Sequence, residues 1–293
     1  FTQTIDLRSP RGRNRTVTVD IPEQGAFRGA YCFLPGAGGQ PAAVAHGTDT
    51  QAGIFIYRLD DGDGPLRLIR YFRDHARDIT SLSVTADGRY LLSGSRDQTV
   101  KLWSLSDLLR PTSFSQSSLW GAEFVLRNNR LLIEQVDPAG IAFRRNLRTS
   151  DTITAITVAS PQGPQRIVDP ATMLRTLSAL SAFSPVFLES LRGQQQLPPR
   201  IIVPGWEPLL TIFIDDRDEW AVFTPEGYYD ASTAEGHRLF GWQINHGPGI
   251  TPRYDPAANL QQTLERPDVI RETLRRGSVE AALGQLGVRA PDD

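Results

Sequence analysis

Hydrophobic and polar residues alternate with a period of two in many short segments of the first 160 residues. Such alternation predicts β-strands that have one buried face. The clearest set lies at residues 79–84, 90–93 and 100–103. The dipeptide Asp87-Gly88 is typical of a tight turn between the first two, and Asp97-Gln98 turns the chain again before the third. We therefore expect a meander of three short antiparallel strands.

Four hydrogen-bonding side chains stand at fixed places around this meander, one before the first strand, one in the second, one in the next turn and one in the third. These residues are His75, Ser93 or Ser95, Asp97 and Trp103. A meander with this set resembles one blade of a WD-repeat β-propeller, although Ser104 replaces the usual aspartate after the tryptophan. The resemblance implies a chain of hydrogen bonds from tryptophan to hydroxyl to histidine to aspartate, which gives each partly buried polar group a partner.

Similar units recur about every 40 to 45 residues, which is the spacing of propeller blades. Residues 30–59 are predicted as a degenerate blade, residues 79–105 as the strongest one, and residues 120–147 as a third that ends in a strand at 141–143. A strand at 153–158 is a candidate for the start of a fourth. Because propellers close with about four blades or more, residues 1–160 are expected to be part of a larger propeller.

The pattern changes after residue 160. Apolar residues at Met173, Leu177 and Leu180 have helical spacing, which predicts a helix over residues 170–180. Residues 185–191 are predicted as another short helix. We therefore expect residues 161–200 to form a helical and loop connection.

An aromatic-rich block occupies residues 201–293. The turn sequence Pro225-Glu226-Gly227 lies between two aromatic segments, which predicts a β-hairpin. A further aromatic strand is expected at residues 239–245, followed by short helices, the last of them capped by Ser278. The overall fold class is therefore mainly β, with WD-type blades followed by a separate block of a hairpin and short helices.

Three segments of this block carry a second resemblance. Residues 224–232, 239–245 and 266–268 read TPEGYYDAS, LFGWQIN and RPD. They resemble a segment of bacterial multidomain proteins that join WD repeats to a caspase-like protease domain. The resemblance implies a non-catalytic, regulatory region that holds a caspase-like domain, in cis or as a separate chain. We expect this region to receive a protein partner or a signal on the propeller face. That domain requires a Cys/His pair, whereas Cys32 lies in an apolar strand and is predicted to be a buried core thiol.

Several residues of the block are candidates for contact with a partner or ligand: Trp220, Tyr228, Tyr229, His237, Trp242 and His246. The tyrosines and Trp242 can stack on a sugar or a peptide, or they can form the core of the hairpin. The two histidines can form a pH-sensitive surface or a structural one. A hydrolase or ligand-binding propeller, with its site in the channel or at this hairpin, is the alternative function. A Ser-His-Asp triad among the blade residues is disfavoured, because triads are defined by geometry rather than by composition.

Composition narrows the function classes. The chain has 293 residues, of which 40% are hydrophobic and 22% are charged, as in ordinary globular proteins. The net charge of −2 does not indicate a nucleic-acid partner or an anionic membrane surface, and no apolar run is long enough to span a membrane. The spacing of the single cysteine and the four histidines predicts no metal or other cofactor. We expect a cytoplasmic protein that is either processed or part of a longer polypeptide, because residue 1 is Phe rather than Met.

Overall fold

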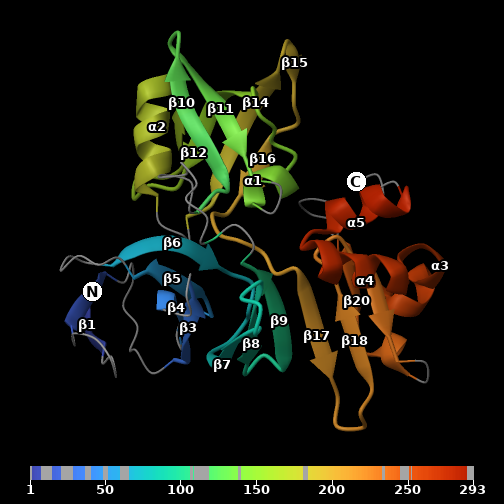
Figure 1. Cartoon of the computed structure of the whole chain (residues 1–293). Coiled ribbons are helices and arrows are strands. Elements are labelled where there is room, and N and C mark those ends of the chain that lie inside the picture. The colour runs from blue at the N-terminus through green and yellow to red at the C-terminus, as the bar shows by residue number, and fades with distance from the viewer. Residues whose placement is uncertain are drawn as a thin grey trace.

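The computed structural model describes residues 2–7, 15–20, 29–36, 41–48, 52–59, 66–105, 108, 119–137, 140–180, 184–232, 235–244, 251 and 253–288. The described chain is mainly β and contains several antiparallel sheets (Figure 1). The predicted fold class is therefore confirmed. No helix among the described residues is long and apolar enough to cross a membrane.

The first blade is a four-stranded antiparallel meander. Its strands are β3 (Tyr31–Pro35), β4 (Pro41–Gly47), β5 (Ile54–Arg58) and β6 (Arg67–Phe72). A separate hairpin of β1 (Thr2–Leu7) and β2 (Arg15–Asp20) precedes it. Alternate residues of the meander, among them Leu34, Ala45 and Ile56, are buried against the second blade. The period of two therefore places one face of each strand in the core between the blades.

The second blade begins with the predicted meander of β7 (Ile79–Val84), β8 (Tyr90–Ser95) and β9 (Thr99–Ser104). Its fourth strand is β17 (Leu210–Ile214), which pairs with β9 so that Leu210 lies opposite Leu102. The same sheet continues into β18 (Trp220–Phe223) and β19 (Tyr229–Ala231). Residues 105–209 are thus inserted between the third and the fourth strand of one blade.

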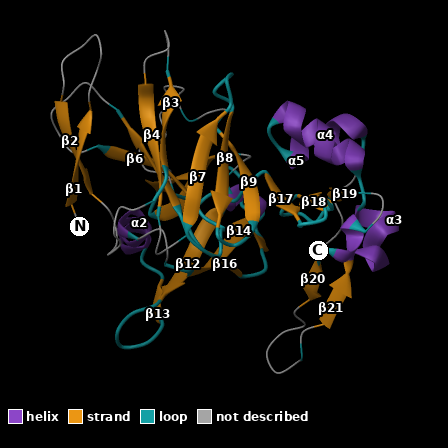
Figure 2. Ribbon diagram, turned by 90° about the horizontal axis from the view of Figure 1, so that it is seen from below, coloured by secondary structure: helices purple, strands orange, loops and turns teal. Residues whose placement is uncertain are grey.

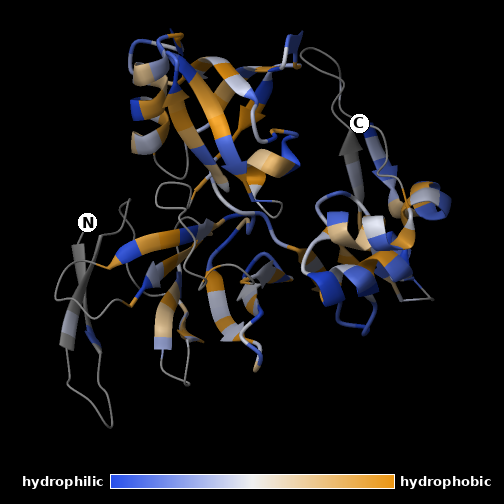
Figure 3. Ribbon diagram, turned by 45° about the horizontal axis from the view of Figure 1, so that its top comes forward, coloured by the Kyte–Doolittle hydropathy of each residue, from blue (hydrophilic) through white to orange (hydrophobic). Residues whose placement is uncertain are grey.

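The inserted region contains a seven-stranded sheet in place of further blades. Its strands are β10 (Ala122–Arg127), β11 (Arg130–Val136), β12 (Thr152–Val158), β13 (Gln165–Ile167), β14 (Val186–Arg192), β15 (Gln195–Gln196) and β16 (Arg200–Ile202). Helix α2 (Pro170–Ala179) packs Met173 and Leu177 against the core of this sheet. Because β12 pairs with β14, the sheet crosses the boundary that we expected at residue 160. Figure 3 shows many hydrophobic residues along the strands of this sheet and along α2.

Two predicted elements of this region were wrong. The strand expected at residues 141–143 is helix α1 (Ile141–Arg144), in which the neighbours Ile141 and Ala142 are both buried. Strand β11 already pairs with β10 on one side and with β12 on the other. A strand at residues 141–143 would therefore find no free edge of β11 to pair with. Residues 120–147 are therefore not a third blade.

The helix expected at residues 185–191 is strand β14. Its buried residues Val186, Leu188 and Ser190 recur with a period of two, and the strand pairs with both β12 and β16. The short apolar run fits either period, and the available sheet edges decide between them.

The C-terminal block is joined to the second blade and is not separate from it, in contrast to our expectation. The block contains the two-stranded sheet of β20 (Gly241–Ile244) and β21 (Arg253–Pro256), the 3-10 turns η2 (Gly236–Arg238) and η3 (Ala257–Leu260), and helices α3 (Gln261–Leu264), α4 (Pro267–Arg276) and α5 (Val279–Leu286). Ile270 of α4 packs against Tyr90 and Leu102 of the blade, and the Tyr90 hydroxyl donates to the Leu274 carbonyl at 2.5 Å. Figure 2 shows α4 and α5 beside the β17–β19 end of the sheet.

Candidate functional site

The polar residues of the second blade form a continuous chain of hydrogen bonds. Trp103 Nε1 donates to Ser93 Oγ at 2.8 Å, Ser93 Oγ lies 2.7 Å from His75 Nε2, and His75 Nδ1 lies 2.8 Å from Asp97 Oδ2. The Asp97 carboxylate can only accept, so His75 carries its proton on Nδ1 and donates it to Asp97. The neutral imidazole then has an unprotonated Nε2, which accepts the hydrogen of Ser93 Oγ. Ser95 stands outside this chain, since its hydroxyl donates to the Arg77 carbonyl.

The electrostatics of these groups agree with a neutral histidine beside an ionised carboxylate. Burial lowers the pKa of His75 below its ordinary value, and the opposing effect of Asp97 is smaller. Burial by itself raises the pKa of Asp97, but hydrogen bonds from Thr99, from the Ala76 N–H and from His75 outweigh it and hold the pKa at about 2. Both groups are thus fixed in one protonation state at neutral pH.

This Ser-His-Asp geometry is that of a structural network. The serine of a hydrolase triad must reach the carbonyl carbon of a substrate. Ser93 is only 1% exposed, and its oxygen already accepts the indole N–H of Trp103. A substrate has no approach to this oxygen, and the network holds the three strands together.

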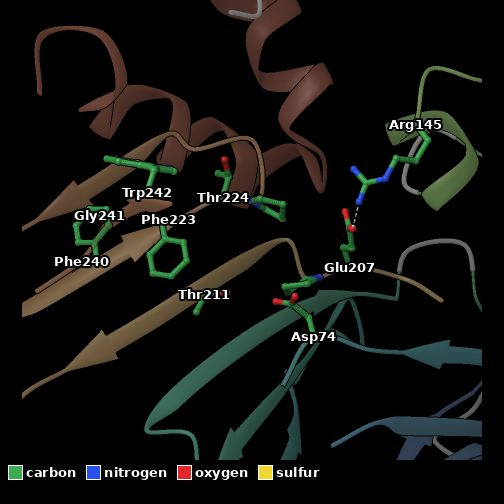
Figure 4. A pocket seen from close by; sticks show the side chains of 11 residues that line it. Asp74, Arg145, Glu207, Thr211, Phe223, Thr224, Phe240, Gly241 and Trp242 are labelled. Atoms are coloured by element: carbon green, nitrogen blue, oxygen red, sulfur yellow. Dashed lines mark hydrogen bonds and ion pairs between the residues drawn. The ribbon is translucent and has the colours of Figure 1, made fainter. Parts of the chain in front are cut away.

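A pocket of about 370 Å³ lies where the second blade, the inserted region and the C-terminal block meet; we call it the junction pocket. It is lined by Asp74, Arg145, Glu207, Pro208, Thr211, Phe223, Thr224, Pro225, Phe240, Gly241 and Trp242. Figure 4 shows the aromatic side chains on one side, Glu207 with Arg145 on the other, and Thr224 between them. The volume falls within the range of pockets that bind small ligands or single side chains of a partner.

A network of ion pairs forms the polar side of the junction pocket. Glu207 lies 3.8 Å from Arg73, 3.4 Å from Arg144 and 3.0 Å from Arg145. Arg144 also lies 3.8 Å from Glu226 in the hairpin turn. These pairs join the inserted region to the end of the first blade and to the C-terminal block.

A separate ion pair and the hydrogen bond beside it connect β9 to Asp74, which follows β6, and to β17. The Lys101 ammonium of β9 is buried, and it donates to Asp74 at 2.5 Å and to Thr211 Oγ1 at 3.1 Å. Buried ammonium groups require such partners. The pair thereby fixes Asp74 at the rim of the pocket.

The candidate contact residues of the block have different surroundings. Trp242 lines the junction pocket, whereas Tyr228 and Tyr229 are buried in the block, where the Tyr229 hydroxyl donates to the Ala257 carbonyl at 3.2 Å. Trp220 and His237 are half-buried outside the pocket lining. His246 lies outside the described residues.

Sequence reasoning missed the charged residues of the pocket. Arg144 is the last residue of α1, Arg145 follows it, and Glu207 lies in the connection before β17. No periodicity or motif links these positions, and only the tertiary structure brings them together. The single cysteine was predicted to be a buried core thiol. Cys32 is instead half-buried and packs against the core between the blades, and burial raises the pKa of its thiol to about 11.

Comparisons with known proteins identify the second blade. Residues 66–104 match the family of the WD domain, G-beta repeat. The COMPASS component SWD1 of Saccharomyces cerevisiae is 38% identical over 64 residues, which are 21% of this chain and 15% of that protein. The pre-rRNA-processing protein IPI3 of Mycosarcoma maydis is 37% identical over 70 residues, 24% of this chain and 11% of that protein. WD repeat-containing protein 18 of Bos taurus is 53% identical over 36 residues, 12% of this chain and 8% of that protein.

Among solved structures, the WD40 β-propeller domain of Doa1 aligns with a TM-score of 0.26 at 12% identity, over 80% of this chain and 73% of that one. The β-propeller domain of Cps50 (Swd1) from Myceliophteria thermophila aligns with a TM-score of 0.24 at 16% identity, over 80% of this chain and 72% of that one. The sequence matches span 15% or less of the length of the curated relatives named above. Residues 66–104, which fold into β6 to β9 and carry the hydrogen-bond chain from Trp103 to Asp97, are a WD repeat.

Proposed function

We propose that this chain is a non-catalytic region for protein interaction and scaffolding, built around its WD repeat. The observation that carries the proposal is the continuous sheet from the WD blade into the C-terminal block, in the order β7-β8-β9-β17-β18-β19. A rigid sheet of this kind holds the loops at its ends in fixed positions, and fixed loops are the usual place of recognition. The polar residues of the blade support the same role, since they are committed to the network around Ser93.

We further propose that the partner held by this scaffold is a caspase-like protease domain, covalently continuous with the chain or supplied as a separate protein. The support is the second sequence resemblance together with the way its segments associate. The Arg266 N–H donates to the Tyr229 carbonyl at 2.8 Å, and the rings of Tyr229 and Trp242 lie 5.8 Å apart. The three resembling segments therefore form one folded unit rather than three unrelated stretches.

The test uses the native polypeptide and a thiol-directed probe for activated cysteines. We expect labelling at a cysteine outside these 293 residues, and loss of proteolysis when that cysteine is replaced. Cys32→Ser is the matched control and should leave proteolysis unchanged, because a thiol with a pKa of about 11 is almost entirely protonated at neutral pH. Labelling of Cys32 itself, or a native protein without any activated cysteine of its own or in a bound partner, would refute the assignment to a caspase-like system.

A further inference from the structure

One wall of the junction pocket is a preformed aromatic surface. The rings of Phe223 and Phe240 stack with centroids 5.5 Å apart and an interplanar angle of 13°. The ring of Trp242 packs edge-on against Phe240 at 5.4 Å. All three side chains are half-buried, so each one is held by its neighbours and still reaches the pocket. Rigid aromatic surfaces of this kind bind apolar or aromatic groups with little loss of conformational entropy.

Thr224 lines the pocket between the aromatic side chains and Glu207 with Arg145, and its hydroxyl is buried just behind the pocket surface. The residue is 1% exposed, and its Oγ1 forms no hydrogen bond within the described part of the chain. Its backbone is fixed in the hairpin turn, because the Thr224 N–H donates to the Tyr228 carbonyl at 2.8 Å and the Gly227 N–H donates to the Thr224 carbonyl at 3.0 Å. A buried hydroxyl without a partner is unfavourable. A ligand that offers a polar atom at this position would remove that cost.

The ion-pair networks around the polar wall have a surplus of positive charge, whereas the charged side chains that line the pocket itself are Arg145, Asp74 and Glu207. The two ion-pair networks contain four cationic side chains, Arg73, Lys101, Arg144 and Arg145, and three carboxylates, Asp74, Glu207 and Glu226. One positive charge is therefore left over. It is accessible at Arg145, whose side chain is 42% exposed and lines the pocket. An arginine that donates one N–H to Glu207 keeps further N–H groups for a second carboxylate.

We propose that the junction pocket binds a peptide carboxylate that is adjacent to an aromatic or large apolar side chain. Arg145 pairs with the carboxylate, the aromatic wall accepts the side chain, and Thr224 Oγ1 bonds a polar atom of the peptide backbone. The carboxylate comes either from the C-terminus of the peptide or from an Asp or Glu side chain next to the apolar residue. The proposal goes beyond the scaffold role, because it assigns a ligand class to a pocket shared by three parts of the chain. It does not depend on which larger domain the scaffold binds.

The experiment measures binding of three small probes to the 293-residue protein by isothermal titration calorimetry. The probes are N-acetyl-L-phenylalanine, N-acetyl-L-phenylalaninamide and N-acetyl-L-aspartyl-L-phenylalaninamide. A charge-assisted hydrogen bond predicts that at least one of the two carboxylate probes binds about 10-fold or more tightly than the neutral amide. The probe that binds more tightly identifies the source of the carboxylate. Arg145→Gln should remove this preference, and added salt should weaken it.

Thr224→Val separates a ligand role from a structural one. The substitution removes a buried hydroxyl without a partner and keeps the shape of the side chain, so the thermal unfolding midpoint should stay unchanged or rise. Binding of the favoured probe should nevertheless weaken about 2- to 10-fold, the effect of one hydrogen bond. Thr273→Val is the matched control: Thr273 also has a buried Oγ1 without a hydrogen-bond partner among the described residues, but it does not line the pocket.

Three results would overturn the proposal. The first is equal affinity for the neutral amide and both carboxylates, which removes the role of Arg145. The second is unchanged binding in Thr224→Val, or an equal loss in Thr273→Val. The third is no saturable binding of any probe. None of these results changes the thiol-labelling outcome that tests the caspase-like assignment, so the two proposals fail separately.

Discussion

Ser93→Ala is the sharpest test of how the WD blade is held together. The hydroxyl of Ser93 joins Trp103 to His75 in the hydrogen-bond chain. Its removal leaves the indole N–H and His75 Nε2 buried without this partner, although the change in volume is small. An unpaired buried polar group costs about 1–3 kcal/mol. With two such groups, we expect the free energy of unfolding to fall by about 2–4 kcal/mol, less than the full sum because neighbouring effects are not additive.

The matched control is Ser95→Ala in the same strand. Ser95 Oγ bonds the Arg77 carbonyl and the Asp97 N–H at the edge of the blade, where water can replace it. We expect a loss of less than about 1 kcal/mol. Urea unfolding with a fixed slope gives both values, and the exchange rate of the Trp103 indole proton reports the local bond. Equal losses for the two variants, or an unchanged indole exchange rate in Ser93→Ala, would refute the assignment of Ser93 as the linking hydroxyl.

Three further predictions concern the same blade. Trp103→Ala should lower the free energy of unfolding by about 3–5 kcal/mol through a cavity beside Phe72, whose ring stacks on the indole at 4.9 Å; a loss below about 1 kcal/mol in urea unfolding would contradict the packing. The free energy of unfolding should fall at acid pH, because folding lowers the pKa of Asp97 from 3.8 to about 2. The ionised carboxylate stabilises the fold by about 1 kcal/mol after solvent screening. This stabilisation is complete above pH 4 and is lost toward pH 2. The lowered pKa of His75 also reduces stability as the pH falls below 6.5, because His75 takes up a proton more readily in the unfolded chain than in the folded one. If the unfolding midpoints of Asp97→Asn follow the wild-type pH profile, the effect of Asp97 is excluded. Tyr90→Phe should cost about 1 kcal/mol and raise amide exchange in α4, because the bond to the Leu274 carbonyl is lost; unchanged exchange there would argue against docking of α4 on the blade.

Local patterns in the sequence were sufficient for elements whose contacts are close along the chain. The meander of β7, β8 and β9 follows from strand alternation and from two short turns, so its polar residues fall into place once the strands pair. Helix α5 begins where Ser278 predicts, because a serine cap acts within one turn. Helix α4 has Pro267 at its first position, which is a local signal of the same kind. The sequence also limited the linking hydroxyl to Ser93 or Ser95, but only the pairing register turned Ser93 toward Trp103.

Tertiary structure decided every feature that depends on distant segments. The fourth strand of the WD blade is β17, which pairs with β9 although residues 105–209 separate the two strands in the sequence. Residues 186–192 and 141–144 took the structures that the free sheet edges allowed, because short apolar runs fit more than one period. The junction pocket combines Asp74, Arg145, Glu207 and Trp242 from segments with no shared motif. Alternation and capping act over a few residues, whereas long-range pairing and buried ion pairs depend on which surfaces meet, and that information is absent from any local window of the sequence.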